Sequence, residues 1–317
     1  MQQKSVHLET IVEGMKSIQT AISTALEDLD GRGRFNSDHW VRPSGGGGCS
    51  KIMLEGDLIA KGGVNFSHVH GPMPERIANG LGLTPGVEFH ATGVSIVLHA
   101  KNPFVPIIHM NVRYFQTSGG KHWFGGGIDA TPIYIQKGEA VSFHQLLKSV
   151  CDRFPSHSYL KYKTWADRYF YLKHREETRG IGGIFFDHLA ADDEPTKQMN
   201  WEFVQEVAAA FVPAYESLAQ PNRLKAYGER ELEWQALRRS RYVEFNLLWD
   251  KGTRFGLDSD GRTESILMSM PPEAKWVYNH NPLPDSPEAD TLLHLKPTDW
   301  LGLETKHGLE KAYPTRN

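Results

Sequence analysis

The chain has 317 residues, a formal net charge of -3 and 23% charged residues, so it carries no overall basic field of the kind that binds nucleic acid. Only two cysteines are present, Cys49 and Cys151, and their wide separation excludes a disulfide framework, a cysteine zinc site and an iron–sulfur cluster. Residues 1–16 lack the apolar centre of a signal peptide, and no window approaches 18 uncharged apolar residues. We therefore expect a cytoplasmic protein without a transmembrane segment.

The first half of the chain changes from a helical to a strand pattern. Apolar residues between Ile11 and Leu26 recur at helical spacing, which predicts a first helix that ends at Gly31. The glycine run 45–48 predicts a flexible turn that leads into a strand near residues 51–54. From about 87 to 136 apolar and polar residues alternate around a proline-containing turn, which predicts antiparallel strands.

The second half is expected to contain more helices. We predict helices around 143–151, 163–175, 201–218 and 229–239, and strands at 184–186, 242–249 and 264–270. The arginines at 238, 239 and 241 are interpreted as a solvated helix end. No repeat or linker divides the chain. These patterns predict a single α+β domain over residues 1–317, a large antiparallel sheet flanked by helices on both faces.

The segment 108–113 is the most informative for chemistry. Strand alternation places His109, Asn111 and Arg113 on one face, and Met110 and Val112 on the other. An imidazole, an amide and a guanidinium on one face can hold a carboxylate and move protons beside it. The alternative is an ordinary solvated sheet face.

Two glycine-containing segments are further candidates. Residues 123–132 read WFGGGIDATP, where glycines permit close backbone approach before Asp129; a bulged turn capped by Asp129 explains this segment equally well. Residues 254–265 predict a polar hairpin tip that carries Arg262, although an exposed loop arginine is commonly just solvated.

Nucleotide cofactors and common hydrolytic motifs have no signature in the chain. The sequence contains no GxxxxGK[ST] loop, no strand–GxGxxG–helix unit and no GxSxG elbow. Fifteen histidines are present, but none forms an HExxH pattern, so a structural role is the default interpretation for each.

In combination, several segments resemble the oxygen-dependent coproporphyrinogen III oxidases. They are NPFVPIIHMNVRYF (102–115), WFGGGIDATPIY (123–134), YFYLKHR (169–175), RGIGGIFFD (179–187), RYVEFNLLWDKGTRFGL (241–257) and GRTESILMSMP (261–271), followed by DWL (299–301). They occur in the family's order from about residue 40 to 302, so residues 1–35 lie outside the recognisable motifs.

The resemblance implies a homodimer that converts two propionates of coproporphyrinogen III to vinyl groups in haem biosynthesis, with dioxygen as co-substrate and no organic cofactor. It places catalytic roles on His109, Asp129 and Arg113. Asp129 would accept pyrrole N–H bonds, and His109 would deliver protons. Arg113 and Arg262 would bind propionates. The implied substrate-binding set is Ser95, Asn111, Val112, Arg113, Asp260, Gly261 and Arg262. Histidines proposed to bind a divalent metal in bacterial members correspond to His99, His109, His144 and His174.

The chain departs from the family's motif in the segment before Arg262, and two alternative functions remain open. Asp260 stands where the family's hairpin usually has a glycine before Gly261 and Arg262, and its carboxylate could either weaken propionate binding or simply point to solvent. The rivals are a metal-dependent oxygenase of another aromatic substrate and a non-catalytic tetrapyrrole carrier. For the dimer interface, the predicted strand with Val243, Phe245 and Leu247 is our candidate.

Overall fold

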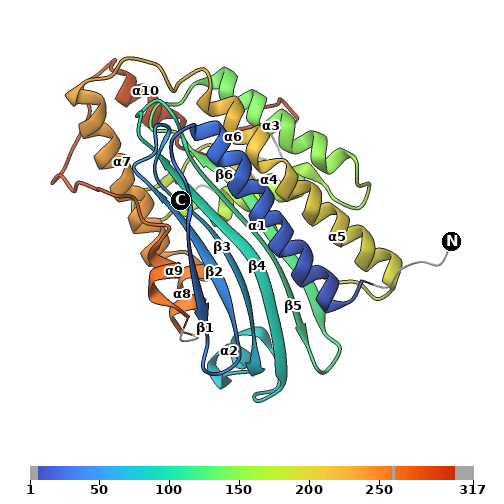
Figure 1. Cartoon of the computed structure of the whole chain (residues 1–317). Helices are drawn as coiled ribbons and strands as arrows, with labels where there is room; N and C mark the ends of the chain where they lie inside the picture. Colours follow the sequence, from blue (N-terminus) through green and yellow to red (C-terminus); the bar gives the residue numbers. More distant parts are fainter. Residues whose placement is uncertain (1–5, 259–260, 304–317) are drawn as a thin grey trace.

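A seven-stranded antiparallel sheet forms the centre of the protein in a computed structural model, which describes residues 6–258 and 261–303 (Figure 1). Neighbouring strands follow the order β1-β2-β3-β4-β5-β6-β9, and every neighbouring pair is antiparallel. The strands are β1 (Asn36–Val41), β2 (Gly46–Leu54), β3 (Ile59–Pro72), β4 (Glu88–Ala100), β5 (Ile107–Thr117), β6 (His122–Thr131) and β9 (Gly182–Leu189). The predicted α+β fold is confirmed. The predicted turn at 45–48 is wrong for residues 46–48, because pairing with β3 fixes them within β2.

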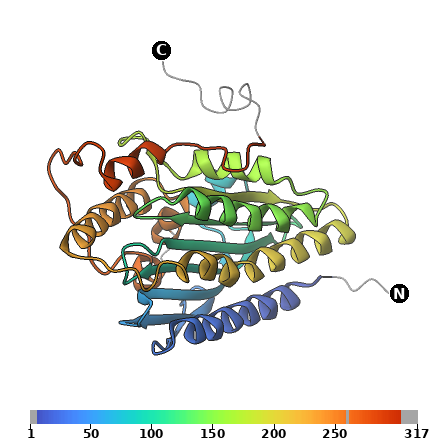
Figure 2. The same ribbon diagram turned by 90° about the horizontal axis from the view of Figure 1, so that it is seen from above.

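Helices cover one face of this sheet as a continuous layer (Figures 1 and 2). They are α1 (Leu8–Asp30), α3 (Lys137–Asp152), α5 (Glu194–Ala209) and α6 (Phe211–Ala219). Their apolar sides bury one set of the alternating residues of β4 and β5, including Ile96, Met110 and Val112. The predicted helix 201–218 is two helices, because Pro213 fits the first turn of α6 but cannot lie inside a continuous helix.

The opposite face is covered by α7 (Glu229–Leu248), α8 (Lys251–Asp258) and α9 (Thr263–Leu267). Trp234 and Tyr242 of α7 pack with Val97 of β4. The strands predicted at 242–249 and 264–270 are therefore wrong. Residues 242–248 continue α7, in which Tyr242 and Phe245 lie one turn apart and are both buried.

The α7 arginines are also buried, so their interpretation as a solvated helix end is wrong. Arg238 makes two bonds to Glu177, Arg239 donates to the Ala100 carbonyl, and Arg241 pairs with Glu244. Burial lowers the pKa of Arg239 to about 10. Arg238 and Arg239 therefore fix α7 to Glu177 and to the end of β4, whereas the Arg241–Glu244 pair lies within α7.

The remaining elements surround the sheet edges. They are α2 (Glu75–Leu81), α4 (Tyr159–Tyr169), α10 (Pro287–His294) and the short pair β7 (Tyr171–Leu172) and β8 (Glu177–Thr178). Helix α4 lies along edge strand β9, where its Tyr162 contacts Phe186 and its Tyr169 stacks on Phe185. Within the described ranges, no helix is both long and apolar enough to cross a bilayer.

Candidate active site

The polar residues predicted on β5 share the sheet face that α7 covers. Strand register places Asn111 opposite Ser95 of β4, His109 opposite Asp129 of β6, and Arg113 opposite a glycine of β6. The alternation predicted from the sequence is thereby confirmed. Val112 is completely buried on the other face, so its side chain cannot contact a ligand bound beside His109.

A buried guanidinium completes the site beneath His109. His109 Nδ1 lies 2.8 Å from Asp129 Oδ1, and Arg179 Nη2 lies 2.7 and 2.8 Å from the two Asp129 oxygens. The side chains of Asp129 and Arg179 are 2% and 1% exposed, whereas His109 is 20% exposed. Of these three side chains, only His109 is therefore exposed to solvent to an appreciable degree.

Three aromatic rings enclose Arg179. Its guanidinium carbon lies 4.3 Å from the Phe170 ring centroid, 4.8 Å from Tyr242 and 4.6 Å from Phe245. These distances suit cation–π attraction, which strengthens when the cation is desolvated. Arg179 lies in the turn that leads into β9, and the next residue is Gly180. A Cβ added to Gly180 would lie 2.2 Å from the Ala130 carbonyl oxygen. The glycine therefore lets the Arg179 turn approach β6 and Asp129.

Hydrogen bonding fixes the protonation pattern of the array. A carboxylate only accepts, so His109 Nδ1 carries the hydrogen, and in the neutral ring Nε2 keeps a free lone pair. Burial alone would raise the pKa of Asp129, but Arg179 and His109 outweigh it and hold that pKa below its ordinary value. The pKa of Arg179 is raised because Asp129 more than offsets the effect of burial. Both Asp129 oxygens accept bonds from within the array, and the direct pyrrole contact expected from the sequence stays a prediction.

Arg113 lies at the β9 side of the same face. Its Nη2 is 2.9 Å from Asp187 Oδ2, and its Nη1 donates to Asn111 Oδ1 at 2.8 Å. A Cβ on Gly125 would lie 2.5 Å from Asp187 Oδ1 and 2.8 Å from an Arg113 nitrogen. The first glycine of the GGG motif thus leaves the space that this ion pair occupies.

An aromatic wall stands beside Arg113. Phe185 of β9 stacks on Tyr169 at 4.2 Å between centroids, contacts the edge of Trp165, and lies under the Arg113 guanidinium at 5.9 Å. Tyr169 also donates to Asp250 Oδ1 at 2.8 Å. This wall gives the polar site one flat, apolar boundary.

Arg262 lies on the other side of the face and begins α9 instead of tipping a hairpin, so the hairpin prediction is wrong. Its Nη2 is 2.5 Å from Asp38 Oδ2 of β1. Two further contacts fix this segment to the sheet. The Ser265 hydroxyl bonds the Ser50 hydroxyl, and the Ser265 carbonyl accepts a hydrogen bond from the Asn65 side chain. Gly261 donates to the Gly256 carbonyl. Asp260 lies outside the described residues.

The four histidines expected to bind a metal have separate partners. His99 donates to the Ser269 carbonyl, and His144 is bonded at both nitrogens, to Tyr159 and to the Ile181 carbonyl. His174 bonds Glu244 and accepts from Trp249. Burial lowers the pKa of His99 to about 3 and that of His144 to about 4. In the part of the chain that the structure describes, no group of three or more His, Cys, Asp or Glu is placed to hold a metal, so this ligand set does not fit.

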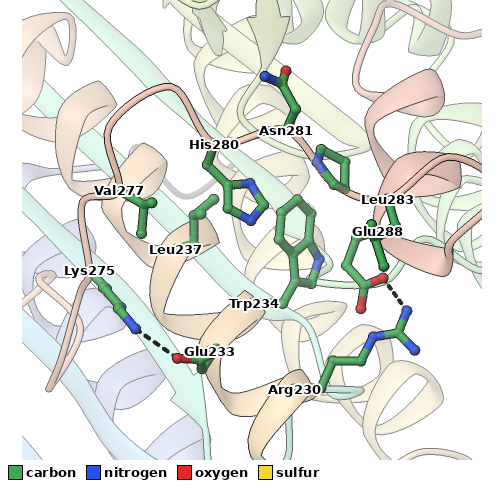
Figure 3. Close-up of a pocket in the computed structure, with 11 residues that line it drawn as sticks. Arg230, Glu233, Trp234, Leu237, Lys275, Val277, His280, Asn281, Leu283 and Glu288 are labelled. Carbon is green, nitrogen blue, oxygen red and sulfur yellow. Dashed lines mark hydrogen bonds and ion pairs between the residues drawn. The ribbon is translucent and has the colours of Figure 1, made fainter.

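A separate hollow is lined by α7, by residues of the segment 275–283 and by Glu288 of α10 (Figure 3). Trp234 and His280 form its aromatic side, with ring centroids 5.9 Å apart. Its cations, Arg230 and Lys275, are already paired with Glu288 and Glu233. The hollow therefore offers few free polar groups to a ligand, and the His109 face is the stronger candidate.

Three participants were not assigned a role from the sequence. Arg179 is separated from Asp129 by 50 residues, and only the glycines that follow it indicate a tight turn. Asp38 and Asp187 lie on opposite edge strands, far from the arginines in sequence. Their roles depend on strand order, which no local pattern contains.

One known protein family matches most of the chain. The family described as coproporphyrinogen III oxidase matches residues 10–300, which includes every described residue of the His109 site and extends the match into α1. This match covers most of the chain and confirms the resemblance found in its motifs. The chain therefore belongs to the coproporphyrinogen III oxidase family, oxidoreductases of porphyrin biosynthesis that decarboxylate coproporphyrinogen III.

Proposed function

We propose that the chain oxidatively decarboxylates two propionates of coproporphyrinogen III to vinyl groups, with dioxygen as electron acceptor, and releases protoporphyrinogen IX. The observation that carries this proposal is the buried Arg179–Asp129–His109 array, which presents one histidine nitrogen on a face flanked by two partly exposed arginines. The carboxylate arms of a tetrapyrrole are the groups that such arginines can bind.

His109 is the proposed proton-transfer residue. Asp129 orients the ring and would stabilise its charged form, as an aspartate does in a catalytic triad. Loss of carbon dioxide and a β-hydrogen from one propionate releases two electrons and one proton. Reduction of dioxygen to hydrogen peroxide consumes two electrons and two protons, so each turn requires one further proton. His109, half-buried and anchored from below, is suited to supply it.

Arg113 and Arg262 are the proposed propionate ligands. Arg113 belongs to β5 and Arg262 is held over β1, four strand spacings away, which is roughly 19 Å at ~4.8 Å per spacing. Ser95 of β4 lies between these two strands, and Asn111 lies beside Arg113 on β5. Each charge-assisted contact contributes ~1.5–3 kcal/mol, enough to fix the register of the macrocycle but not to explain catalysis.

The reducing power resides in the substrate. A porphyrinogen is a reduced, electron-rich macrocycle, so the proposed reaction needs no organic cofactor. The metal route is not part of the proposal, because the four expected ligands do not fit a shared site.

The decisive experiment is aerobic turnover of coproporphyrinogen III by purified, metal-analysed protein, followed by fluorescence after oxidation of the product to the porphyrin. An anaerobic reaction and a reaction with EDTA are the matched controls. Oxygen-dependent product that survives EDTA supports the proposal. Activity lost with EDTA and restored by one divalent metal would instead support a metal-dependent oxygenase, and binding without turnover under any condition would support a carrier.

We also propose that the protein is a cytoplasmic homodimer. The interface expected at residues 243, 245 and 247 has no strand to support it, because these residues belong to α7 and Phe245 is buried against Arg179. Analytical ultracentrifugation over a range of protein concentrations tests the dimer directly. A single species of monomer mass throughout would contradict it.

A further inference from the structure

Both proposed propionate ligands are already paired with carboxylates of the protein. Arg113 contacts Asp187 of β9 at 2.9 Å, and Arg262 contacts Asp38 of β1 at 2.5 Å. Strands β1 and β9 are the two edges of the sheet, so the two aspartates approach the site from opposite sides. Carboxylates of the protein itself thus neutralise the arginines at both ends of the site.

These pairs differ from the buried pair beneath His109. The side chains of Arg113 and Asp187 are 34% and 23% exposed, and those of Arg262 and Asp38 are 32% and 50% exposed, against 1% and 2% for Arg179 and Asp129. A partly exposed pair gains little net stability and can exchange partners with water or another anion. A fully buried pair cannot, because an uncompensated charge would remain in the interior.

We propose that Asp38 and Asp187 are stand-in carboxylates, which hold Arg262 and Arg113 in place until propionates displace them. This inference rests on the proposed function and names the residues against which the substrate must compete. It also addresses the reaction itself. A guanidinium that stays bound to a reacting propionate opposes its loss as neutral carbon dioxide. Asp187 is positioned to pair with Arg113 again as the propionate loses its negative charge.

Neutral isosteres separate this role from a structural one. Asp187→Asn and Asp38→Asn keep the side-chain shape but remove the competing charge. Each should bind the substrate about 2- to 5-fold more tightly, the fold-change that ~0.5–1 kcal/mol of a partly exposed ion pair gives at 1.4 kcal/mol per tenfold. For Asp187→Asn, kcat should fall together with KM, because the ground state gains more than the transition state.

The binding test uses the stable porphyrin coproporphyrin III and its uncharged tetramethyl ester as probes, with fluorescence quenching as the readout. The matched control is Glu233→Gln, which removes the exposed Glu233–Lys275 pair far from the site. Tighter binding of the tetra-acid by both aspartate variants, with no gain for the ester or for the control, is the expected result. Circular dichroism verifies that each variant is folded. Because Asp38 is half-exposed, Asp38→Asn is expected to leave the fold intact, and it tests the proposal independently of Asp187→Asn.

The outcomes distinguish the two proposals. A parent protein that binds and turns over the substrate, with variants that bind the tetra-acid no better, would overturn the stand-in role alone. An equal gain for the ester would overturn it as well, because the effect would not involve carboxylates. A parent protein that neither binds the porphyrin nor reacts with the porphyrinogen would overturn both proposals.

Discussion

At the scale of single residues, the Arg179–Asp129 pair is the least replaceable feature of the site. Removing one partner of a buried ion pair leaves an uncompensated charge and typically lowers the free energy of unfolding by ~3–5 kcal/mol. We expect a loss of about this size for Arg179→Met, with an increase in the pKa of Asp129. The double variant Arg179→Met/Asp129→Asn should recover part of it. Urea denaturation of the four proteins gives the coupling energy, and strictly additive losses would contradict the expectation.

A second residue-scale prediction concerns the orientation of His109. Asp129→Asn presents an amide that can donate to Nδ1, which favours the ring form with hydrogen on Nε2. By analogy with the aspartate of a catalytic triad, kcat should fall by about 10³–10⁴-fold. Turnover kinetics on folded protein check this value, with His109→Gln as the comparison. A kcat within tenfold of the parent would exclude the proposed orienting role.

The individual residues also show what a sequence pattern can and cannot identify. His109, Asn111 and Arg113 were predictable because strand alternation assigns a face to each residue without knowledge of the rest of the fold. Arg179 was not, because its role depends on the docking of β9 beside β6 and on the rings of Phe170, which follows α4, and of α7. The order of the motifs was enough to predict the family, whereas the ion pairs could be identified only in the three-dimensional structure.

At the scale of elements, α7 connects the site to the periphery through Glu244. Its carboxylate contacts His174 at 2.7 Å, Arg175 at 2.7 Å and Trp276 at 3.0 Å. Burial would raise its pKa, but the bonds from Arg175 and His174 outweigh it and lower the pKa to about 2. Because this folded-state pKa lies below the ordinary value of 4.5, the stabilisation is complete above about pH 4.5 and is lost as the pH falls toward 2.

Glu244→Gln should therefore lower the free energy of unfolding by ~1–3 kcal/mol at pH 7, since one pKa unit corresponds to about 1.4 kcal/mol. The difference from the parent should shrink as the pH falls below about 4. Denaturant titrations at pH 7, 5 and 3.5 measure both quantities. A difference that stays constant across this range would show that the charge of Glu244 is not responsible.

The same helix explains the main error of prediction from sequence. Val243, Phe245 and Leu247 alternate with polar residues, a period of two that favours a strand over 242–249. The alternation is accidental. Glu244 and Asn246 are buried polar residues that bond to arginines, so they are not solvent-facing as a strand pattern requires. Contacts with residues distant in sequence therefore decide that this segment is helical, although its local alternation favours a strand.

At the scale of the whole molecule, buried neutral histidines should control stability in mild acid. Burial lowers the pKa of His68, His144 and His157 to about 4, with His90 and His70 contributing at His68. Above pH 6.5 these groups are neutral in both folded and unfolded states. Below it the unfolded chain binds protons that the folded protein excludes, so the free energy of unfolding falls as the pH drops toward 4.

Denaturation between pH 7.5 and 5 should show this decline, with a slope that reports the protons taken up on unfolding. In His144→Gln the slope should decrease by about one proton per molecule, whatever the change in absolute stability. An unchanged slope would mean that His144 titrates alike in both states.

The array beneath His109 has a consequence for the order of folding. Asp129 and Arg179 are 50 residues apart, His109 and Arg179 are 70 apart, and the rings around the guanidinium come from Phe170 and from α7. Closing such long loops costs entropy that is recovered only when the sheet and α7 have docked. The β5–β6 hairpin supplies only His109 and Asp129, whereas Arg179 and the rings around it come from later parts of the chain. Catalytic competence should therefore arise in the last cooperative step of refolding, together with native tertiary structure rather than with the earlier formation of helices.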